Sequence, residues 1–259
     1  MKRMKLRTLC AAAAGAMSLM TGSQALAMAP STVDFSHGME GWVGSAGTGS
    51  GSYAGIDNAL GGSLAFHTIS PGDGWSISTS SNANFLGNFT SAKSITFSLD
   101  INVAELAIGN HGGWPLTQDL ILEFRDTDKP GPQLPYSSVW FRLGYIGGYQ
   151  PANQHFSVTI ADTSSNVLPA GWHGAGDFNY YGDSTLPYAQ TFRRILQDVD
   201  QVVVSTYVPG YIYGAEQFYD LSVDNISISA VPEPEQAAML LAGLGLIGWT
   251  ARRRQRQQD

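Results

Sequence analysis

Residues 94–103 read SITFSLDINV, and apolar and polar side chains alternate along them without a break. Every second residue from Ile95 to Val103 is large and apolar, whereas the residues between them are Thr, Ser, Asp and Asn. A period of two places successive side chains on opposite faces of an extended chain. This stretch therefore predicts a half-buried antiparallel strand, with one face on a core and the other in water.

The same alternation recurs on both sides of this stretch. Only residues 192–199 keep helical spacing, with apolar side chains at i, i+3, i+4 and i+7. Many short strands, one short helix and no βαβ rhythm predict an all-β fold, an antiparallel β-sandwich or jelly roll. The other predicted strands are 33–36, 63–69, 75–79, 119–125, 138–145, 155–162, 201–208 and 221–229.

The chain begins with the features of a signal peptide. Residues 1–7 are basic, and residues 9–20 are mostly apolar. Ala25 and Ala27 form an A-x-A pattern, which predicts that the Sec machinery exports the chain and that residues 1–27 are removed. Cleavage after Ala29 fits as well, and a retained membrane helix is the alternative.

The C-terminal stretch, residues 231–259, reads VPEPEQAAMLLAGLGLIGWTARRRQRQQD. Its prolines end the preceding strand, because proline lacks the N–H that a strand ladder needs. An uncharged apolar run at 237–251 and a basic end at 252–256 follow. The order predicts a C-terminal membrane helix with its basic end in the cytoplasm. The run is shorter than the ~20 residues of a usual span, so a buried terminal helix is the alternative.

These three parts, in this order, resemble the PEP-CTERM sorting signal of Gram-negative bacteria. The matching residues are Pro232, Glu233 and Pro234, then the apolar run, then Arg252, Arg253 and Arg254. The resemblance implies export across the inner membrane and a transient anchor in that membrane. It also implies cleavage near the Pro-Glu-Pro motif by an exosortase-type protease, and a final place at the cell surface or in the medium.

The body between these signals, residues 30–230, is acidic and lacks cysteine. It holds six basic and 18 acidic residues, a net charge of −12, although the whole chain has −7. Such a surface repels nucleic acid and anionic lipid, whereas divalent cations and neutral polymers suit it. The only cysteine, Cys10, lies in the leader, so the exported body has no disulfide.

Several short features follow one another along the body. They are Asp34-Phe35 with Glu40-Gly41-Trp42, Gly74-Trp75-Ser76-Ile77, Phe85-Leu86-Gly87-Asn88-Phe89, residues 193–199 with the strand that follows, and residues 221–226. In this order they resemble a laminin B (laminin IV type A) domain, a galactose-binding-like jelly roll, over residues 33–229. The family often has Asp after Phe-Leu-Gly, where this chain has Asn88. The cysteine-rich modules that flank the animal domain are absent, so matrix assembly by those modules is not carried over.

The sequence supports catalysis poorly and calcium binding somewhat better. A glycan hydrolase needs two carboxylates that face each other, and the apolar-flanked candidates Glu105, Glu123 and Glu216 lie in no known motif. Asp34 and Asp224 belong to the first and last predicted strands, which often lie together in jelly rolls. Related binding modules hold a structural ion there, so these two residues predict a Ca²⁺ site. A turn or bulge at Asp224 is the structural alternative. Asp126 and Asp128, which flank a tight turn, are another candidate pair for calcium, and a solvated turn at 126–131 is the alternative there.

Exposed aromatic rings that stack on sugars are the other candidate site. Trp140 is on the outward side of its predicted strand, and the long loop at 171–187 contains Trp172, Tyr180 and Tyr181. Packing in the core is the alternative for each of these rings. Trp114 is a further candidate, whereas Trp42 and Trp75 are assigned to the core. The prediction is an exported, surface-sorted, non-catalytic protein that binds glycan or extracellular matrix polymer. The alternatives are a secreted glycan hydrolase on the same fold and a structural biofilm or coat component without a discrete site.

Overall fold

The computed structural model describes residues 29–46, 52–58, 62–68, 74–179, 182–210, 217–230 and 244. The predicted signal peptide therefore lies outside the described residues, and so does the sorting tail apart from residue 244. Within the described ranges, no helix combines the length and the apolarity that crossing a membrane requires.

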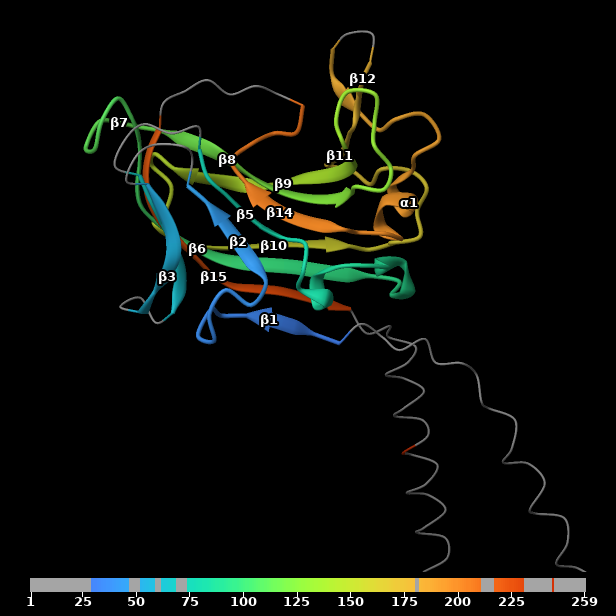
Figure 1. The fold of residues 1–259 in the computed structure, drawn as a ribbon, viewed down its shortest axis with the longest axis horizontal. Coiled ribbons are helices and arrows are strands. Elements are labelled where there is room, and N and C mark those ends of the chain that lie inside the picture. The colour runs from blue at the N-terminus through green and yellow to red at the C-terminus, as the bar shows by residue number, and fades with distance from the viewer. Residues whose placement is uncertain are drawn as a thin grey trace, which may run out of the picture.

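Two antiparallel sheets are stacked face to face in Figure 1, which confirms the predicted jelly-roll sandwich with one short helix. In the seven-stranded sheet the order is β10-β6-β15-β4-β3, with β1 beside β15 and β7 beside β6. The quoted alternating stretch lies in β6, which pairs with β10 and β15. The strands are β1 (Ser31–Val33), β3 (Tyr53–Asp57), β4 (Ser63–His67), β6 (Ile95–Ile108), β7 (Trp114–Pro115), β10 (Asn153–Ile160) and β15 (Gln217–Ala230).

The six-stranded sheet has the order β11-β9-β8-β14-β5-β2 and covers the other side of the core. A small two-stranded ribbon, β12 (Asp177–Phe178) with β13 (Ser184–Thr185), stands beside it. The strands of the six-stranded sheet are β2 (Trp42–Ser45), β5 (Ser76–Thr79), β8 (Thr117–Asp126), β9 (Ser137–Gly147), β11 (Trp172–Ala175) and β14 (Gln201–Ser205).

The helical elements lie between strands and carry part of the core. The predicted helix is α1 (Phe192–Leu196), and its first, fourth and fifth residues are buried. Thr191 caps it, because its side chain accepts a hydrogen bond from the Arg194 N–H. The helix ends before Val199, which instead bridges to Gly87 next to the two 3₁₀ turns, η2 (Ala83–Phe85) and η3 (Phe89–Ser91).

Two stretches contain strands although their sequences predict loops: the long loop at 171–187, and residues 44–55, whose Gly and Ser content predicts another. The Gly/Ser-rich segment 44–55 includes the end of β2 and the start of β3, and the loop 171–187 includes β11, β12 and β13. Gly44 shows the reason in the first case. A Cβ there would lie 2.7 Å from the Ala54 Cβ and 2.9 Å from the Phe66 ring, so glycine permits two strands to approach closely.

The outer face of the six-stranded sheet is partly covered by loop residues, whereas the outer face of the seven-stranded sheet is open around β6. On the six-stranded sheet, Ile121, Trp140 and Ala175 form a second buried cluster with Val208, against which Leu134 of a loop packs. On the seven-stranded sheet, the outward side chains of β6 are polar and partly exposed. We call the outward side of β6, β10 and β15 the polar face, and it is the open surface of the sandwich.

Candidate functional site

The polar face is ordered by hydrogen bonds between side chains on neighbouring strands. β6 pairs with β10 on one side and with β15 on the other, so polar residues at equivalent register positions meet. Each such contact joins residues that are far apart in the chain. The contacts are Thr96 with Thr159 (2.8 Å), Ser98 with Ser227 (2.7 Å), Asn102 with Asn153 (2.5 Å) and Asp100 with His155 (2.6 Å).

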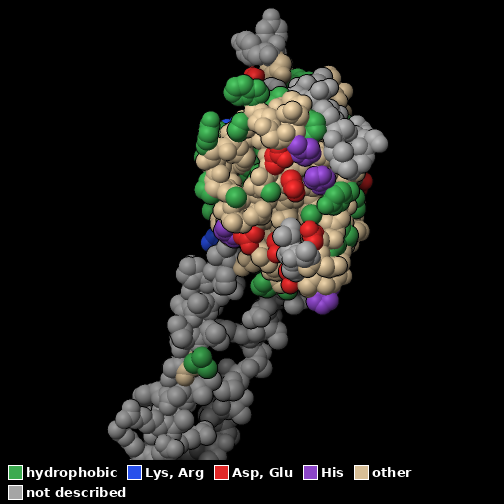
Figure 2. All heavy atoms as spheres, turned by 90° about the vertical axis from the view of Figure 1, so that its left-hand side faces the viewer, with side chains coloured by type: hydrophobic (Ala, Val, Ile, Leu, Met, Phe, Trp, Pro, Cys, Tyr) green, Lys and Arg blue, Asp and Glu red, His purple; other side chains and the backbone are tan. Residues whose placement is uncertain are grey.

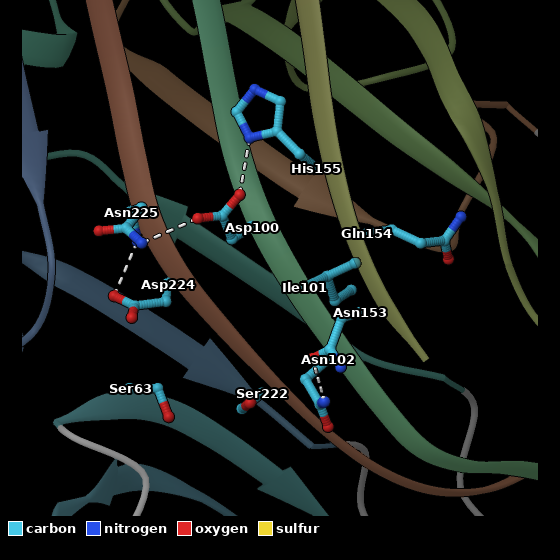
Figure 3. Close-up of a pocket in the computed structure, with 10 residues that line it drawn as sticks. All are labelled: Ser63, Asp100, Ile101, Asn102, Asn153, Gln154, His155, Ser222, Asp224 and Asn225. Carbon is cyan, nitrogen blue, oxygen red and sulfur yellow. Dashed lines mark hydrogen bonds and ion pairs between the residues drawn. The ribbon is translucent and has the colours of Figure 1, made fainter. Parts of the chain in front are cut away.

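A cavity of about 520 Å³ lies on this face, and we call it the polar groove. Four strands, β4, β6, β10 and β15, supply its lining (Figure 3). The residues are Ser63, Asp100, Ile101, Asn102, Asn153, Gln154, His155, Ser222, Asp224 and Asn225. The lining thus combines carboxylate, amide, hydroxyl and imidazole groups.

Asn225 connects the two carboxylates of the groove (Figure 3). Its side-chain amide donates to Asp100 Oδ2 at 2.8 Å, and its backbone N–H donates to Asp224 Oδ1 at 2.7 Å. The strand register shifts between Asp224 and Ser227, and Asn225 has a φ of 50°. A bulge of this kind changes the direction in which a side chain points, and here it brings the amide to Asp100.

The groove is electrostatically negative. Burial, followed by the neighbouring carboxylates of Asp34 and Asp100, raises the pKa of Asp224 above its ordinary value. Asp100 Oδ1 lies 2.6 Å from His155 Nδ1, and no lysine or arginine is among the lining residues. The arrangement favours ligands that donate hydrogen bonds and disfavours anions.

A histidine and carboxylate cluster lies farther along the same sheet. His67 and His111 stack with ring centroids 5.5 Å apart, and His111 Nδ1 lies 2.7 Å from Glu105 Oε2. The hydrogen bond with Glu105 raises the pKa of His111. Figure 2 shows acidic and histidine side chains gathered on the side of the molecule where β3 and β7 lie.

One exposed aromatic side chain, Trp114, lies close to the end of β6. It lies on β7, pairs with Ile108 at the end of β6, and is 82% exposed. Trp114 therefore satisfies the requirement for a sugar-stacking ring that the sequence analysis set.

The aromatic rings that were predicted to bind ligand lie elsewhere. Trp172 is only 6% exposed and packs in the main core against Phe124, Phe141 and Phe192, so its predicted exposure is wrong. The reason is that β11 pairs with β9 and places Trp172 opposite Phe141, on the inner side of the sheet.

Trp140 does point to the outer side of its sheet, as predicted, but it is not available to a ligand. It is 6% exposed, because Val208 and the loop residue Leu134 cover it and His173 stacks on it at 4.3 Å. The predicted exposure of Trp140 is therefore also wrong. Tyr180 and Tyr181 lie outside the described residues.

The predicted proximity of the first and last strands is confirmed, since β1 pairs with β15 and Val33 lies opposite Ile226. The Asp34 carboxylate is near enough to raise the pKa of Asp224. A calcium ion between Asp34 and Asp224 stays a prediction. Asp34 also groups with His37 and Glu40, whose ligand atoms lie within 4.8 Å of one another, and all three are exposed.

Of the three glutamates considered for hydrolysis, the two that the structure describes, Glu105 and Glu123, lie in different sheets. Glu105 is held by His111, Glu123 is buried against Arg125, and Glu216 lies outside the described residues. Two other carboxylates, those of Asp100 and Asp224, share the polar groove. Alternation alone placed Asp100 on the outer face, but the sequence carried no signal for its register with Asp224, which is 124 positions away.

Comparison with known proteins identifies the end of the chain. Residues 230–255 match the PEP-CTERM protein-sorting motif. No curated protein matches the chain.

Several solved structures resemble the body at low identity. A Clostridium thermocellum endo-1,4-beta-D-xylanase 10B, with CBM22-1 and GH10 modules and xylohexaose, is 12% identical over 78% of this chain and 28% of its own length, with a TM-score of 0.40. This chain thus spans about a quarter of that xylanase. The CBM22-2 xylan-binding domain of Paenibacillus barcinonensis Xyn10C is 11% identical, and the match covers 78% of this chain and 99% of that domain, with a TM-score of 0.42. CBM28, a carbohydrate-binding module specific for non-crystalline cellulose, is 13% identical, and the match covers 75% of this chain and 90% of that module, with a TM-score of 0.33. Values this low do not transfer a ligand to this chain.

Proposed function

We propose that this is an exported, surface-sorted, non-catalytic protein whose polar groove binds a neutral extracellular polysaccharide. The observation that carries the proposal is the groove of about 520 Å³, to which four adjacent strands contribute hydrogen-bonding side chains. The strands fix these groups before a ligand arrives, and pre-organised groups lose less entropy on binding.

The chemistry of the groove selects the class of polymer. Sugar hydroxyls donate to carboxylates such as Asp100 and both donate to and accept from amides such as Asn102. An acidic polysaccharide would meet two carboxylates without a lysine or arginine in the lining, within a body of net charge −12. The exposed ring of Trp114 offers an apolar surface for stacking at the end of β6, the strand that carries Asp100 and Asn102.

The double variant Asp100→Ala/Asn102→Ala tests the groove. We expect it to weaken binding of the full-length protein to its neutral polysaccharide at least tenfold, or about 1.4 kcal/mol, because it removes a carboxylate and an amide that face the ligand. Affinity gel electrophoresis against soluble neutral and acidic polysaccharides, together with pull-down on insoluble ones, measures the change.

Thr159→Ala is the matched control, because Thr159 lies on β10 and the same face but outside the groove lining. It should leave retention unchanged. If wild-type protein bound no neutral polysaccharide, or if the double variant bound as tightly as the control, the groove would not be the binding site.

A hydrolase is the second candidate, because Asp100 and Asp224 line one cavity and the pKa of Asp224 is raised. The two residues are cross-strand neighbours on one sheet face. Glycosidases instead place their carboxylates on either side of the scissile bond, so the geometry favours binding. Release of reducing sugar by the wild type and its loss in Asp224→Asn would establish hydrolysis instead.

We further propose that the Sec machinery exports the chain, that the leader is cut after Ala27, and that residues 237–251 anchor it temporarily. An exosortase-type protease would then cut near Pro232-Glu233-Pro234, with Arg252, Arg253 and Arg254 on the cytoplasmic side. The sorting-motif match supports this route. β15 ends at Ala230, so cleavage just after it would release a sandwich with all its described strands.

Cell fractionation with an antibody to the body tests this route. We expect a full-length form in the membrane and a shorter form at the surface or in the medium. The variant Pro232→Ala/Pro234→Ala should remain full length in the membrane, because the cleavage motif is gone, while Gln236→Ala beside the motif should be processed normally. Wild-type protein that stays full length in the membrane would contradict the proposal.

The likeness of residues 33–229 to a laminin B domain stays a prediction. It implies a galactose-binding-like jelly roll, whereas the proposed ligand rests on the polar groove. A coat component without a discrete site would show no loss of binding in the Asp100→Ala/Asn102→Ala variant, so the same experiment separates the two.

A further inference from the structure

A second cavity, of about 400 Å³, lies where three chain segments meet. The end of β8 contributes Asp126, the segment before α1 contributes Gln190, and the turn after α1 contributes Asp198. The remaining lining residues are Lys129, Arg194 and Gln197. The lining is therefore entirely polar, and it is distinct from the polar groove.

Two buried oxygen atoms among these residues lack a hydrogen-bond partner. Asp126 is 1% exposed, and no described residue donates to its Oδ1. The Oε1 atom of Gln190 is also buried and unpartnered. Buried acceptors are almost always satisfied in native proteins, by protein groups, water or an ion. Both oxygens belong to residues that line this cavity, so a ligand bound there would supply the partner that each of them lacks.

The charges of the neighbourhood favour a cation as that ligand. Burial raises the pKa of Asp126, and the carboxylates of Asp198 and Asp200 raise it further, whereas the Lys129 ammonium and a hydrogen bond from the Asp128 N–H lower it in part. Asp200 is engaged, because the Thr127 N–H and hydroxyl both donate to its Oδ2. Arg194 is directed to the backbone, since its Nη1 donates to the Ala189 carbonyl at 2.6 Å.

We propose that Asp126, Gln190 and Asp198 bind a calcium ion. Carboxylate and amide oxygens are ligands of hard cations, and the lining offers no histidine or cysteine for zinc. Calcium accepts six to eight oxygens in flexible geometry, so water completes the shell, whereas magnesium demands a tighter octahedron. The ion joins the end of β8 to both flanks of α1, which stabilises a body that has no disulfide.

Thermal unfolding of the full-length chain tests the site with the metal alone. Raising CaCl₂ from a chelated baseline to a hundredfold excess over Kd should increase Tm by roughly 5 to 11 °C. Asp126→Asn and Asp198→Asn should abolish most of this increase. In chelator, Asp126→Asn should be at least as stable as the wild type, because it removes the charge of a carboxylate whose Oδ1 is buried without a hydrogen-bond partner.

Three further measurements decide among alternatives. Asp34→Asn should keep the calcium-dependent increase, which separates this site from the predicted one at Asp34 and Asp224. Lys129→Gln should bind calcium more tightly, because it removes a like charge beside the ion. A matched concentration of MgCl₂ should give less than half of the increase in Tm.

A Tm that is the same in calcium and in chelator would overturn the site. An increase that survives in Asp126→Asn would also overturn it. An equal response to magnesium would overturn the assignment to calcium. Lower stability of Lys129→Gln in chelator, without any calcium dependence in the wild type, would show that Lys129 itself neutralises Asp126.

Discussion

Replacing Trp172 with alanine is expected to lower the free energy of unfolding by about 3–5 kcal/mol. Trp172 is buried in the main core, where its ring stacks on Phe124 at 5.9 Å and meets the edge of Phe192 at 5.3 Å. The substitution would leave a cavity between β8, β9 and α1, and the surrounding sheet cannot collapse fully into it. For a domain of this size the corresponding fall in Tm is roughly 6–20 °C.

Denaturant unfolding of the full-length chain measures this loss, and Trp114→Ala is the matched control. The control removes the same side chain from a site that is 82% exposed, so its unfolding free energy should stay within about 0.5 kcal/mol of the wild type. Equal losses in the two variants would contradict the assignment of Trp172 to the core. Protein that remains folded in the Trp172 variant should retain its polysaccharide affinity, because the polar groove lies on the other sheet.

The fold was predictable because alternation is a local property. The period of two at residues 94–103 predicted that every second residue from Ile95 to Val103 faces inward, and that Asp100 and Asn102 between them face outward. The structure has this arrangement. Ten consecutive residues of the sequence carry that information. The other predicted strands show the same alternation of apolar and polar residues, and residues 192–199 show helical spacing. The sandwich and its short helix were therefore predictable from the sequence.

The candidate site was less predictable, because cover and register depend on distant segments. Alternation placed Trp140 on an outer face, but it could not show that Val208 and Leu134 would cover that face. It could not show either that Asp100 and Asn225 would meet, since a bulge 125 residues farther along the chain brings them together.

β11 was missed for another reason. The strand has only four residues, and its sequence, Trp-His-Gly-Ala, is too short to show a period. Trp172 could therefore be assigned either to a binding loop or to the core, and only the pairing of β11 with β9 decides between them.

Removing the Glu123 carboxylate is the second change expected to have a large effect. Glu123→Ala should lower the free energy of unfolding by about 3–5 kcal/mol, because it leaves Arg125 without its counter-charge. Glu123 Oε2 accepts from Arg125 Nε at 2.8 Å and from Nη2 at 2.6 Å, and its Oε1 accepts from the Ser138 hydroxyl at 2.6 Å. The side chain of Glu123 is 3% exposed, so water cannot replace these bonds.

The double variant Glu123→Leu/Arg125→Leu separates a lost pair from a lost side chain. It should recover most of the stability, because the two charges are removed together and apolar groups fill part of their volume. Arg142→Ala provides the control, since its ion pair with Asp119 is 47% exposed on the arginine side and should contribute about 0–1 kcal/mol. A Glu123→Ala variant no less stable than this control would show that the buried pair does not stabilise the sheet.

Polysaccharide binding should persist in every folded variant, because Glu123 belongs to β8 and the groove to the opposite sheet. Loss of a hydrolytic activity in Glu123→Ala, at unchanged stability, would instead return this carboxylate to a catalytic role.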